Sequence, residues 1–378
     1  MKHRFLMIFF IALLIPSVFI GHSLLTLDYS QEEIQELFVG IDVAYDNLDE
    51  IKRLINEVSP YTNLFVIGST GISYNETKLN ETCQYLYDKD MYFIIFSAGR
   101  NRLQLFIDIQ KKYEDHFLGV YFDDEQGGRQ LDIFEWRWVN EADNSSDAAN
   151  QFVDGLNLWL EGKFIRNETF YQIAPSDFYL FTSDYAFYWF DYKAGYDVVF
   201  AEFGWNYSRQ LNVALDRGAA TVQNKDWGVM ITWTYNHPPY IESGKELYED
   251  MILAYNNGAK YIIVFDTNKN YTEGILEQEH LEALKQFWDY ANNNPRTSRA
   301  SSERVAFVLP KDYGYGFRGP DDKIWGLWET DALSLEISHH LGYWLKEYGT
   351  NLDIIYDDMK YSGLYSKYVF WNGTIYNP

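Results

Sequence analysis

From residue 38 the sequence repeats one unit, a short apolar segment followed by a longer segment whose apolar residues recur three and four positions apart. The short segments are typical of buried strands and the longer ones of amphipathic helices. Strands are expected at residues 38–45, 63–69, 91–98, 117–123, 178–183, 198–203, 227–234 and 261–266. Helices are expected at residues 47–58, 80–87, 103–113, 148–161, 211–222, 245–256 and 277–291. Because strands that alternate with helices form parallel sheets, the pattern predicts an α/β protein.

The number of these units separates the two common parallel architectures. Eight strand and helix units over residues 38–291 fit a (β/α)₈ TIM barrel, which needs about 250 residues. A nucleotide-binding doubly wound sheet would carry a glycine-rich phosphate loop after one strand, and the sequence has none. We therefore predict a TIM barrel, and we expect no cofactor.

A second, smaller unit is expected after the barrel. Residues 292–302 are polar and without periodicity, which is typical of a linker. Residues 303–378 follow, with strands expected at 305–309, 352–356 and 368–371 and a helix at 335–348. This small α/β unit resembles a flavodoxin-like domain, but it is short, so its sheet would need the barrel or a partner to cover it. The glycine-rich loop 311–320 either reaches the barrel mouth or only connects the two units.

The N-terminal residues 1–23 have the pattern of a secretory signal. Lys2, His3 and Arg4 precede an apolar run from Phe5 to Ile20. Because the residues that follow match a cleavage site poorly, this segment is either a removed signal peptide or an N-terminal membrane anchor. Both alternatives predict an extracellular or cell-surface protein that meets the membrane only through this segment.

The sequons and the single cysteine matter for such an exported chain. Seven Asn-x-Ser/Thr sequons are possible glycan acceptors, at Asn75, Asn80, Asn144, Asn167, Asn206, Asn270 and Asn372. Cys83 is the only cysteine, so no disulfide can form within the chain.

Composition and motif searches exclude several partners. The formal net charge of −24 argues against nucleic acid as a partner. The seven histidines are scattered without metal-ligand spacing, and the run from Asp123 to Glu125 lacks the 12-residue calcium-loop pattern, so we predict no metal site. The sequence leaves the oligomeric state open.

The expected fourth strand ends in three consecutive carboxylates. One of its faces carries Leu118, Val120 and Phe122, which suit packing under helices. The other face carries small and polar residues, namely Gly119, Tyr121, Asp123 and Glu125. If strict alternation continues past the strand, Asp123 and Glu125 point into the barrel mouth, where TIM-barrel enzymes have their active sites. The alternative is that these carboxylates cap the next segment or lie in a solvated acidic loop.

Carboxylates recur at other strand ends, and this recurrence suggests chemistry. Acidic residues follow the first, fourth, sixth and eighth expected strands, at Asp42, Asp123, Asp124, Glu125, Glu202 and Asp266. Cleavage of a glycosidic bond needs one protonated carboxyl and one ionised carboxylate. The candidates for this catalytic pair are Asp123, Glu125 and Glu202.

Aromatic residues lie beside these carboxylates in the sequence. Aromatic residues make up 19% of the chain, and six occupy expected loops or strand ends: Trp136, Trp138, Trp205, Trp233, Tyr235 and Tyr240. Sugar rings stack on aromatic planes while their hydroxyls bind polar groups, although any single aromatic residue can equally belong to the core. The expected substrate-binding residues are Asp42, Asp124, Trp205, Trp233, Tyr235 and Asp266. The insertion 129–147 should fold over the strand ends and help to shape the site.

Several segments of residues 38–291 resemble segments of secreted glycoside hydrolases built on (β/α)₈ barrels. Within that group, they resemble exported archaeal proteins of uncharacterised activity more than the proteins of any named hydrolase family. The segments are Val120–Glu125, Phe200–Asn206, Trp227–Trp233 and Gly258–Asp266. Where many retaining hydrolases of this architecture have a catalytic glutamate on strand seven, this chain has Thr232, Trp233 and Thr234. Another group of barrels pairs acids on strands four and six, which in this chain implies Glu202 as the second member.

The sequence therefore predicts an exported glycoside hydrolase that acts on an oligo- or polysaccharide of the cell surface or the environment. One alternative is a barrel that binds carbohydrate without turnover, because the same aromatic residues and carboxylates would serve binding alone. The other alternative is a structural cell-surface protein. The sequence leaves the sugar, the linkage and the stereochemistry open.

Overall fold

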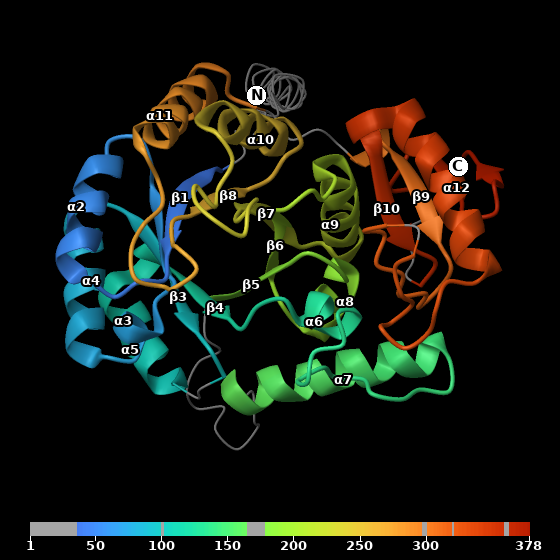
Figure 1. Cartoon of the computed structure of the whole chain (residues 1–378), viewed down its shortest axis with the longest axis horizontal. Coiled ribbons are helices and arrows are strands. Elements are labelled where there is room, and N and C mark those ends of the chain that lie inside the picture. The colour runs from blue at the N-terminus through green and yellow to red at the C-terminus, as the bar shows by residue number, and fades with distance from the viewer. Residues whose placement is uncertain (1–35, 100–101, 165–177, 297–300, 320, 359–362) are drawn as a thin grey trace, which may run out of the picture.

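The protein was analysed as a computed structural model that describes residues 36–99, 102–164, 178–296, 301–319, 321–358 and 363–378. The expected signal or anchor, residues 1–23, lies outside the described residues, as does part of the expected linker. Eight parallel strands form a closed barrel in chain order, and β8 pairs with β1 to close it. Figure 1 shows the strands at the centre, helices around them, and the C-terminal unit beside α9. The predicted TIM barrel is confirmed.

The eight barrel strands follow the predicted order. Their bounds are β1 Phe38–Val43, β2 Leu64–Ile67, β3 Tyr92–Ser97, β4 Phe117–Phe122, β5 Tyr179–Asp184, β6 Val198–Phe203, β7 Asp226–Ile231 and β8 Tyr261–Phe265. The expected seventh strand is too long by three residues, since β7 ends at Ile231 and the next residues form a loop at the barrel mouth.

The helices of the barrel include three short ones that the sequence pattern did not predict. The longer helices are α2 Leu48–Val58, α4 Glu76–Asp88, α5 Leu103–Tyr113, α7 Ser145–Phe164, α9 Arg209–Gln223, α10 Gly244–Asn256 and α11 Gln278–Asn293. The short ones are α3 Thr70–Ser73, α6 Gln126–Leu131 and α8 Tyr188–Ala194. A helix of seven residues or fewer spans about two turns at most, so its apolar residues show no clear period.

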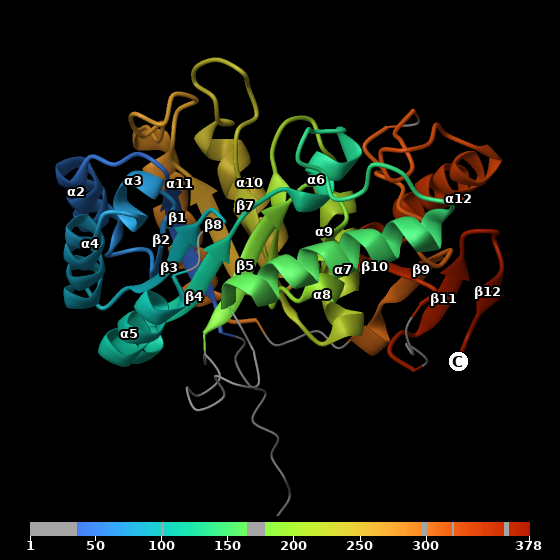
Figure 2. The ribbon, with the colours of Figure 1, turned by 90° about the horizontal axis from the view of Figure 1, so that it is seen from below.

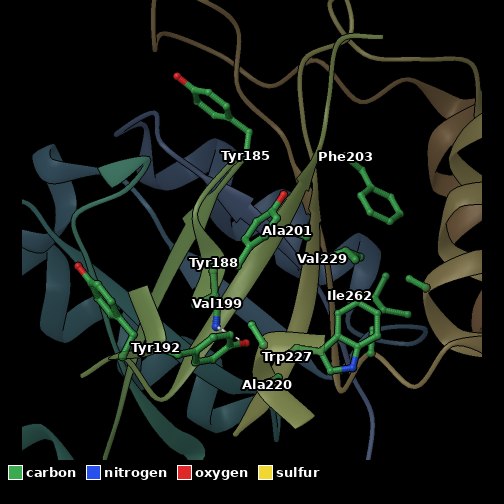
Figure 3. Packing of buried hydrophobic residues seen from close by; sticks show 14 of the residues in the cluster. Tyr185, Tyr188, Tyr192, Val199, Ala201, Phe203, Ala220, Trp227, Val229 and Ile262 are labelled. Atoms are coloured by element: carbon green, nitrogen blue, oxygen red, sulfur yellow. Dashed lines mark hydrogen bonds between the residues drawn. The ribbon is translucent and has the colours of Figure 1, made fainter. Parts of the chain in front are cut away.

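The barrel strands separate two apolar cores. Inward-facing side chains fill the barrel, and Phe181 and Phe200 stack there with ring centroids 5.5 Å apart. Outward-facing side chains pack under the helices. Figure 3 shows part of this outer core, where Val199, Ala201 and Phe203 of β6 lie beside residues of β7 and β8. Alternate residues of one strand therefore belong to different cores, as the pleat requires.

The fourth strand departs from strict alternation near its start. Its pairing with β3 shifts register between Phe93 and Ile94, and Leu118 packs against the inner core, not under the helices as expected. Gly119 has a φ of +154°, and a Cβ there would lie 2.0 Å from the carbonyl oxygen of Tyr179. Glycine is required at this position, next to the bulge, because any side chain would clash with the backbone of β5.

The C-terminal unit is a small mixed sheet packed against the barrel. Its elements are β9 Val305–Leu309, α12 Ala332–Tyr348, β10 Leu352–Tyr356, β11 Lys367–Phe370 and β12 Ile375–Tyr376. The strand order is β10-β9-β11-β12, with only β12 antiparallel. In Figure 1 the sheet lies between α9 and α12.

The barrel helix α9 covers one face of this C-terminal sheet. The helix comes so close to β10 that a Cβ at Gly218 would lie 2.3 Å from the carbonyl oxygen of Ile354. Arg217, also on α9, donates to the carboxylate of Asp353 at 2.7 Å, and both side chains are buried. This arrangement agrees with the expectation that the small sheet needs the barrel to cover it.

Helix α7 connects the two units along one side, as Figure 2 shows. Near its start, Ser146 donates a hydrogen bond to Asp312 of the C-terminal unit, at 2.7 Å. Near its end, Trp159 contacts the loop after β4. Within the described part of the chain, no helix has the length and apolarity to span a bilayer.

Candidate functional site

A cavity of about 320 Å³ lies at the carboxyl ends of the barrel strands. Every strand, or the loop directly after it, contributes to its wall. The lining residues are Asp42, Ala44, Gly68, Thr70, Phe96, Tyr121, Asp124, Glu125, Ser183, Glu202, Trp205, Met230, Thr232, Trp233, Phe265 and Tyr271. Four carboxyl groups therefore meet in one cavity, at the end of the barrel where this fold has its active sites.

Glu202 lies at the end of β6 and belongs to a chain of hydrogen bonds across three strands. Ser183 of β5 donates its hydroxyl proton to Oε1 of Glu202 at 2.7 Å. The hydroxyls of Tyr121 and Ser183 are 2.7 Å apart, so Tyr121 donates to Ser183 when Ser183 donates to Glu202. Burial, followed by the charge of Glu125, raises the pKa of Glu202 well above its usual value, while the Ser183 bond opposes this rise.

Glu125 occupies a turn in which the backbone leaves the extended conformation. Its φ is +53°, in the left-handed region that is uncommon for residues other than glycine. The backbone N–H of Glu125 donates to the carbonyl of Ser183 at 2.8 Å, which ties the turn to β5. Burial and the charges of Asp124 and Asp184 raise the pKa of Glu125 to about 8. A carboxyl group with such a pKa is protonated at neutral pH and can act as a general acid.

The other two carboxyl groups of the cavity differ in their partners. Asp124 accepts a hydrogen bond from Arg129 of α6 at 2.5 Å, so a cation compensates its charge. Oδ1 of Asp42 is buried and has no hydrogen-bond partner among the described residues. Burial and the charge of Asp124 raise the pKa of Asp42 well above its usual value. A Cβ at Gly68 would lie 2.1 Å from Oδ1 of Asp42, so only glycine allows β1 and the end of β2 to approach so closely here.

Asp123 and Asp266 do not line the cavity. Asp123 also has a left-handed backbone, with a φ of +52°, and its carboxylate accepts a hydrogen bond from Nε1 of Trp159 at 3.0 Å. Asp266 accepts hydrogen bonds from the backbone N–H groups of Ile275 and Leu276, at 2.6 and 2.9 Å. Asp123 thus anchors the turn to α7, and Asp266 fixes the loop after β8.

Two of the predicted aromatic residues line the mouth of the cavity, together with one that was not predicted. Trp205 and Trp233 do so as expected from their strand ends, and Tyr271 joins them from the loop after β8. Trp233 is fixed because Nε1 donates to the carbonyl of Thr267 at 2.7 Å. The ammonium of Lys269 lies 4.8 Å from the ring centroid of Trp205 and 5.2 Å from that of Trp233. The rings therefore have fixed positions that suit stacking on a sugar.

The other aromatic residues of the sequence prediction lie outside the cavity lining, namely Trp136, Trp138, Tyr235 and Tyr240. Tyr235 is 40% exposed and stacks on His237. The insertion 129–147 contributes none of the described lining residues, and it meets the site through Arg129, which donates to the lining residue Asp124. The side chain of Gln130 explains this placement, because its amide group donates to the carbonyls of Val139 and Trp325 and draws the insertion toward the C-terminal unit.

The loop of the C-terminal unit reaches the barrel near this site. Arg318 donates to Asp132, which follows α6, at 2.7 Å, and its guanidinium lies over the ring of Tyr185. Arg318 does not line the cavity, so the loop braces the region around the mouth without contributing to the wall. Among the described residues, no group of three or more His, Cys, Asp or Glu side chains is arranged to hold a metal ion.

Sequence reasoning missed several residues of the site. Ser183 and Tyr121 were within predicted strands but were not recognised as partners of Glu202. Their inward orientation follows from alternation along β4 and β5, so a model of the barrel register could have identified them. Tyr271 lies in a loop, where no periodic signal exists.

Comparisons with known proteins identify the fold but no family. No protein-family model and no curated protein matches the chain. The chain is similar to the structure of a β-galactosidase from the psychrophilic Marinomonas ef1, with 11% identity and a TM-score of 0.55 over 88% of this chain and 72% of that one. A β-1,4-D-mannanase from Cryptopygus antarcticus aligns with 13% identity and a TM-score of 0.40 over 66% of this chain and 91% of that one. The likeness to the β-galactosidase structure is one of fold alone.

Proposed function

We propose that the protein is a glycoside hydrolase in which Glu125 is the general acid and Glu202 is the nucleophile or general base. The observation that carries the proposal is a pair of glutamates, Glu202 buried and Glu125 half-buried, both with raised pKa values, that line one cavity at the barrel mouth. Glycosidic cleavage requires one carboxyl in each protonation state. Because burial raises the pKa of both groups and the charge of Glu125 raises that of Glu202 further, the pair retains a proton at neutral pH.

The hydrogen bonds support this assignment of roles. Glu202 accepts the hydroxyl proton of Ser183, and a donated hydrogen bond favours the ionised form of a carboxylate. Glu125 has three acidic neighbours that favour its protonated form, namely Asp124, Asp132 and Asp184. Glu202 also has three acidic neighbours, namely Glu125, Asp184 and Asp124, so the bond from Ser183 is what distinguishes the two groups. On this ground we assign the proton of the pair to Glu125, from which it passes to the leaving oxygen of the substrate.

The composition of the cavity wall favours a neutral glycan as the substrate. Its described lining residues include four carboxyl groups and no lysine, arginine or histidine. A uronic acid would bring a further negative charge near ionised Glu202, which costs binding energy in a partly buried site. Asp42 lines the cavity, so its carboxyl group is suited to bind a sugar hydroxyl, while Trp205 and Trp233 provide stacking surfaces.

Hydrolysis assays with the purified full-length protein test this proposal. The panel pairs neutral oligosaccharides with the corresponding uronic acid oligosaccharides, and the variant Glu125→Gln/Glu202→Gln is the matched control. We expect turnover of at least one neutral glycan by the wild type and none by the double variant. Glycan binding of equal strength in both proteins, with no turnover in either, would favour the carbohydrate-binding alternative. Faster hydrolysis of the uronic acid member would refute the proposed substrate class.

We further propose that the protein acts outside the cell or at its surface. The support is the sequence alone, because the positive charges of Lys2 and Arg4 precede an apolar run. N-terminal sequencing of protein from the medium and from the membrane fraction tests this. A first residue near position 24 indicates a cleaved signal, and an intact N-terminus in the membrane indicates an anchor. Recovery of the protein only from the cytosol would contradict export.

A further inference from the structure

Asp184, the last residue of β5, is fully buried beside the turn that carries Glu125. Its carboxylate accepts four backbone hydrogen bonds. Two come from the first turn of α6, from Gly127 at 2.6 Å and from Gly128 at 2.9 Å. The other two come from the residues after β5, from Tyr185 at 2.8 Å and from Ala186 at 3.0 Å. One side chain thus binds the end of β5 to the segment that directly follows Glu125.

The glycines in this segment allow the close approach. A Cβ at Gly127 would lie 2.5 Å from the carbonyl oxygen of Ala186, and a Cβ at Gly128 would lie 2.0 Å from the ring of Tyr185. Three backbone N–H groups of this turn therefore donate to residues of β5. The N–H of Glu125 donates to the carbonyl of Ser183, and those of Gly127 and Gly128 donate to the carboxylate of Asp184. The left-handed backbone conformation of Glu125 is unfavourable by itself, and these hydrogen bonds and close contacts hold the backbone in it.

We infer that Asp184 is a positioning residue for Glu125, because its carboxylate holds the turn that directs the Glu125 side chain into the cavity. This inference rests on the proposed function, in which Glu125 is the general acid. General acid catalysis depends on placing the proton within hydrogen-bond reach of the leaving oxygen. Displacement of the acid by about 1 Å can lower the rate by about a hundredfold.

Asp184 also acts on Glu125 through its charge. Burial raises the pKa of Asp184 to about 6, and the four N–H groups oppose this rise, so the group is ionised at neutral pH. The charge of Asp184 then raises the pKa of Glu125, after the larger effects of burial and Asp124. Other titratable or charged groups around the two residues are Arg129, Asp132, Tyr185, Tyr188, Asp191, Glu202, Asp216 and Tyr271.

The variant Asp184→Asn removes the charge and one acceptor, and Asp191→Asn is its matched control. Asp191 on α8 is also fully buried, and burial and the charge of Asp184 raise its pKa well above the usual value, so it is already neutral. For Asp184→Asn we expect kcat to fall by about tenfold to a hundredfold. We also expect the alkaline limb of the pH profile to move to lower pH, because the pKa of Glu125 decreases. Asp191→Asn should leave that limb in place.

Two measurements test the inference even if the wild type hydrolyses no glycan. The first is an NMR titration of the Glu125 carboxyl, assigned by comparison with Glu125→Gln. An unchanged titration in Asp184→Asn would overturn the inference, and a shift to lower pH would support it. The second needs only the wild type, in case Asp184→Asn does not fold. Protection of the Gly127 and Gly128 amides from hydrogen exchange should fall below about pH 6, where Asp184 becomes protonated. Constant protection across that pH range would overturn it.

Discussion

Replacement of Ser183 by alanine tests the assigned role of Glu202. The hydroxyl of Ser183 donates to Oε1 of Glu202 at 2.7 Å, and both residues are buried. A hydrogen bond to a charged group contributes about 1.5–3 kcal/mol. Because about 1.4 kcal/mol corresponds to a factor of ten in rate, Ser183→Ala should lower kcat/KM by about tenfold to a hundredfold. Loss of the donor also raises the pKa of Glu202, so the acidic limb of the pH profile should move to higher pH.

The assay is the pH dependence of kcat/KM for a neutral glycan that the wild type hydrolyses. The matched control is Tyr121→Phe, which removes the outer hydroxyl of the chain and leaves the bond from Ser183 to Glu202. Its effect should therefore be smaller and in the same direction. Rates within a factor of two of the wild type and an unmoved acidic limb in Ser183→Ala would refute the reasoning that this bond stabilises ionised Glu202.

Three further perturbations have defined outcomes. Activity should fall as the pH rises through about 8, because Glu125 must be protonated to act as the acid and has a raised pKa; a pH profile of kcat/KM measures this. Gly119→Ala should lower the free energy of unfolding by more than about 2 kcal/mol, because the new Cβ would meet the carbonyl oxygen of Tyr179; denaturant titration measures this. Arg217→Ala should lower it by roughly 1.5–3 kcal/mol, because it removes the charged hydrogen bond to buried Asp353 and leaves Arg304 as the remaining cation; thermal unfolding measures this.

Matched controls separate these effects from those of substitution in general. Gly162→Ala changes a helical glycine with open space around its Cβ position, so it should not destabilise the protein. Lys245→Ala removes one side of an exposed ion pair and should change stability by less than about 0.5 kcal/mol. Equal effects of Gly119→Ala and Gly162→Ala, or of Arg217→Ala and Lys245→Ala, would contradict the packing and ion-pair arguments.

The barrel could be predicted from the sequence because its signal is periodic and repeated. Each buried strand and each amphipathic helix was visible by itself, and eight such units leave few alternatives for a parallel sheet. The bulge at Gly119 was not predictable in this way, because it depends on how closely β4 approaches Tyr179 of β5. The same holds for α8, whose residues are buried on all sides and so show no amphipathic period.

The candidate site could be predicted only in part. The sequence indicated the correct strand ends, and Glu202 and Glu125 line the cavity. It did not indicate which of the consecutive carboxylates faces inward, because the left-handed backbone at Asp123 and Glu125 breaks the alternation of a strand. Asp184 was not recognised because a buried carboxylate that binds only backbone N–H groups has no sequence signature.

The most direct test of the central claim compares two leaving groups in two variants. An aryl glycoside with an acidic leaving group, such as dinitrophenol, leaves without protonation, whereas an alkyl glycoside needs the general acid. The account predicts that Glu125→Gln retains most of its activity on the aryl substrate and loses about a hundredfold or more on the alkyl one. Glu202→Gln should lose activity on both substrates. Equal losses on both substrates in Glu125→Gln, or retained activity in Glu202→Gln, would contradict the paired-carboxylate mechanism.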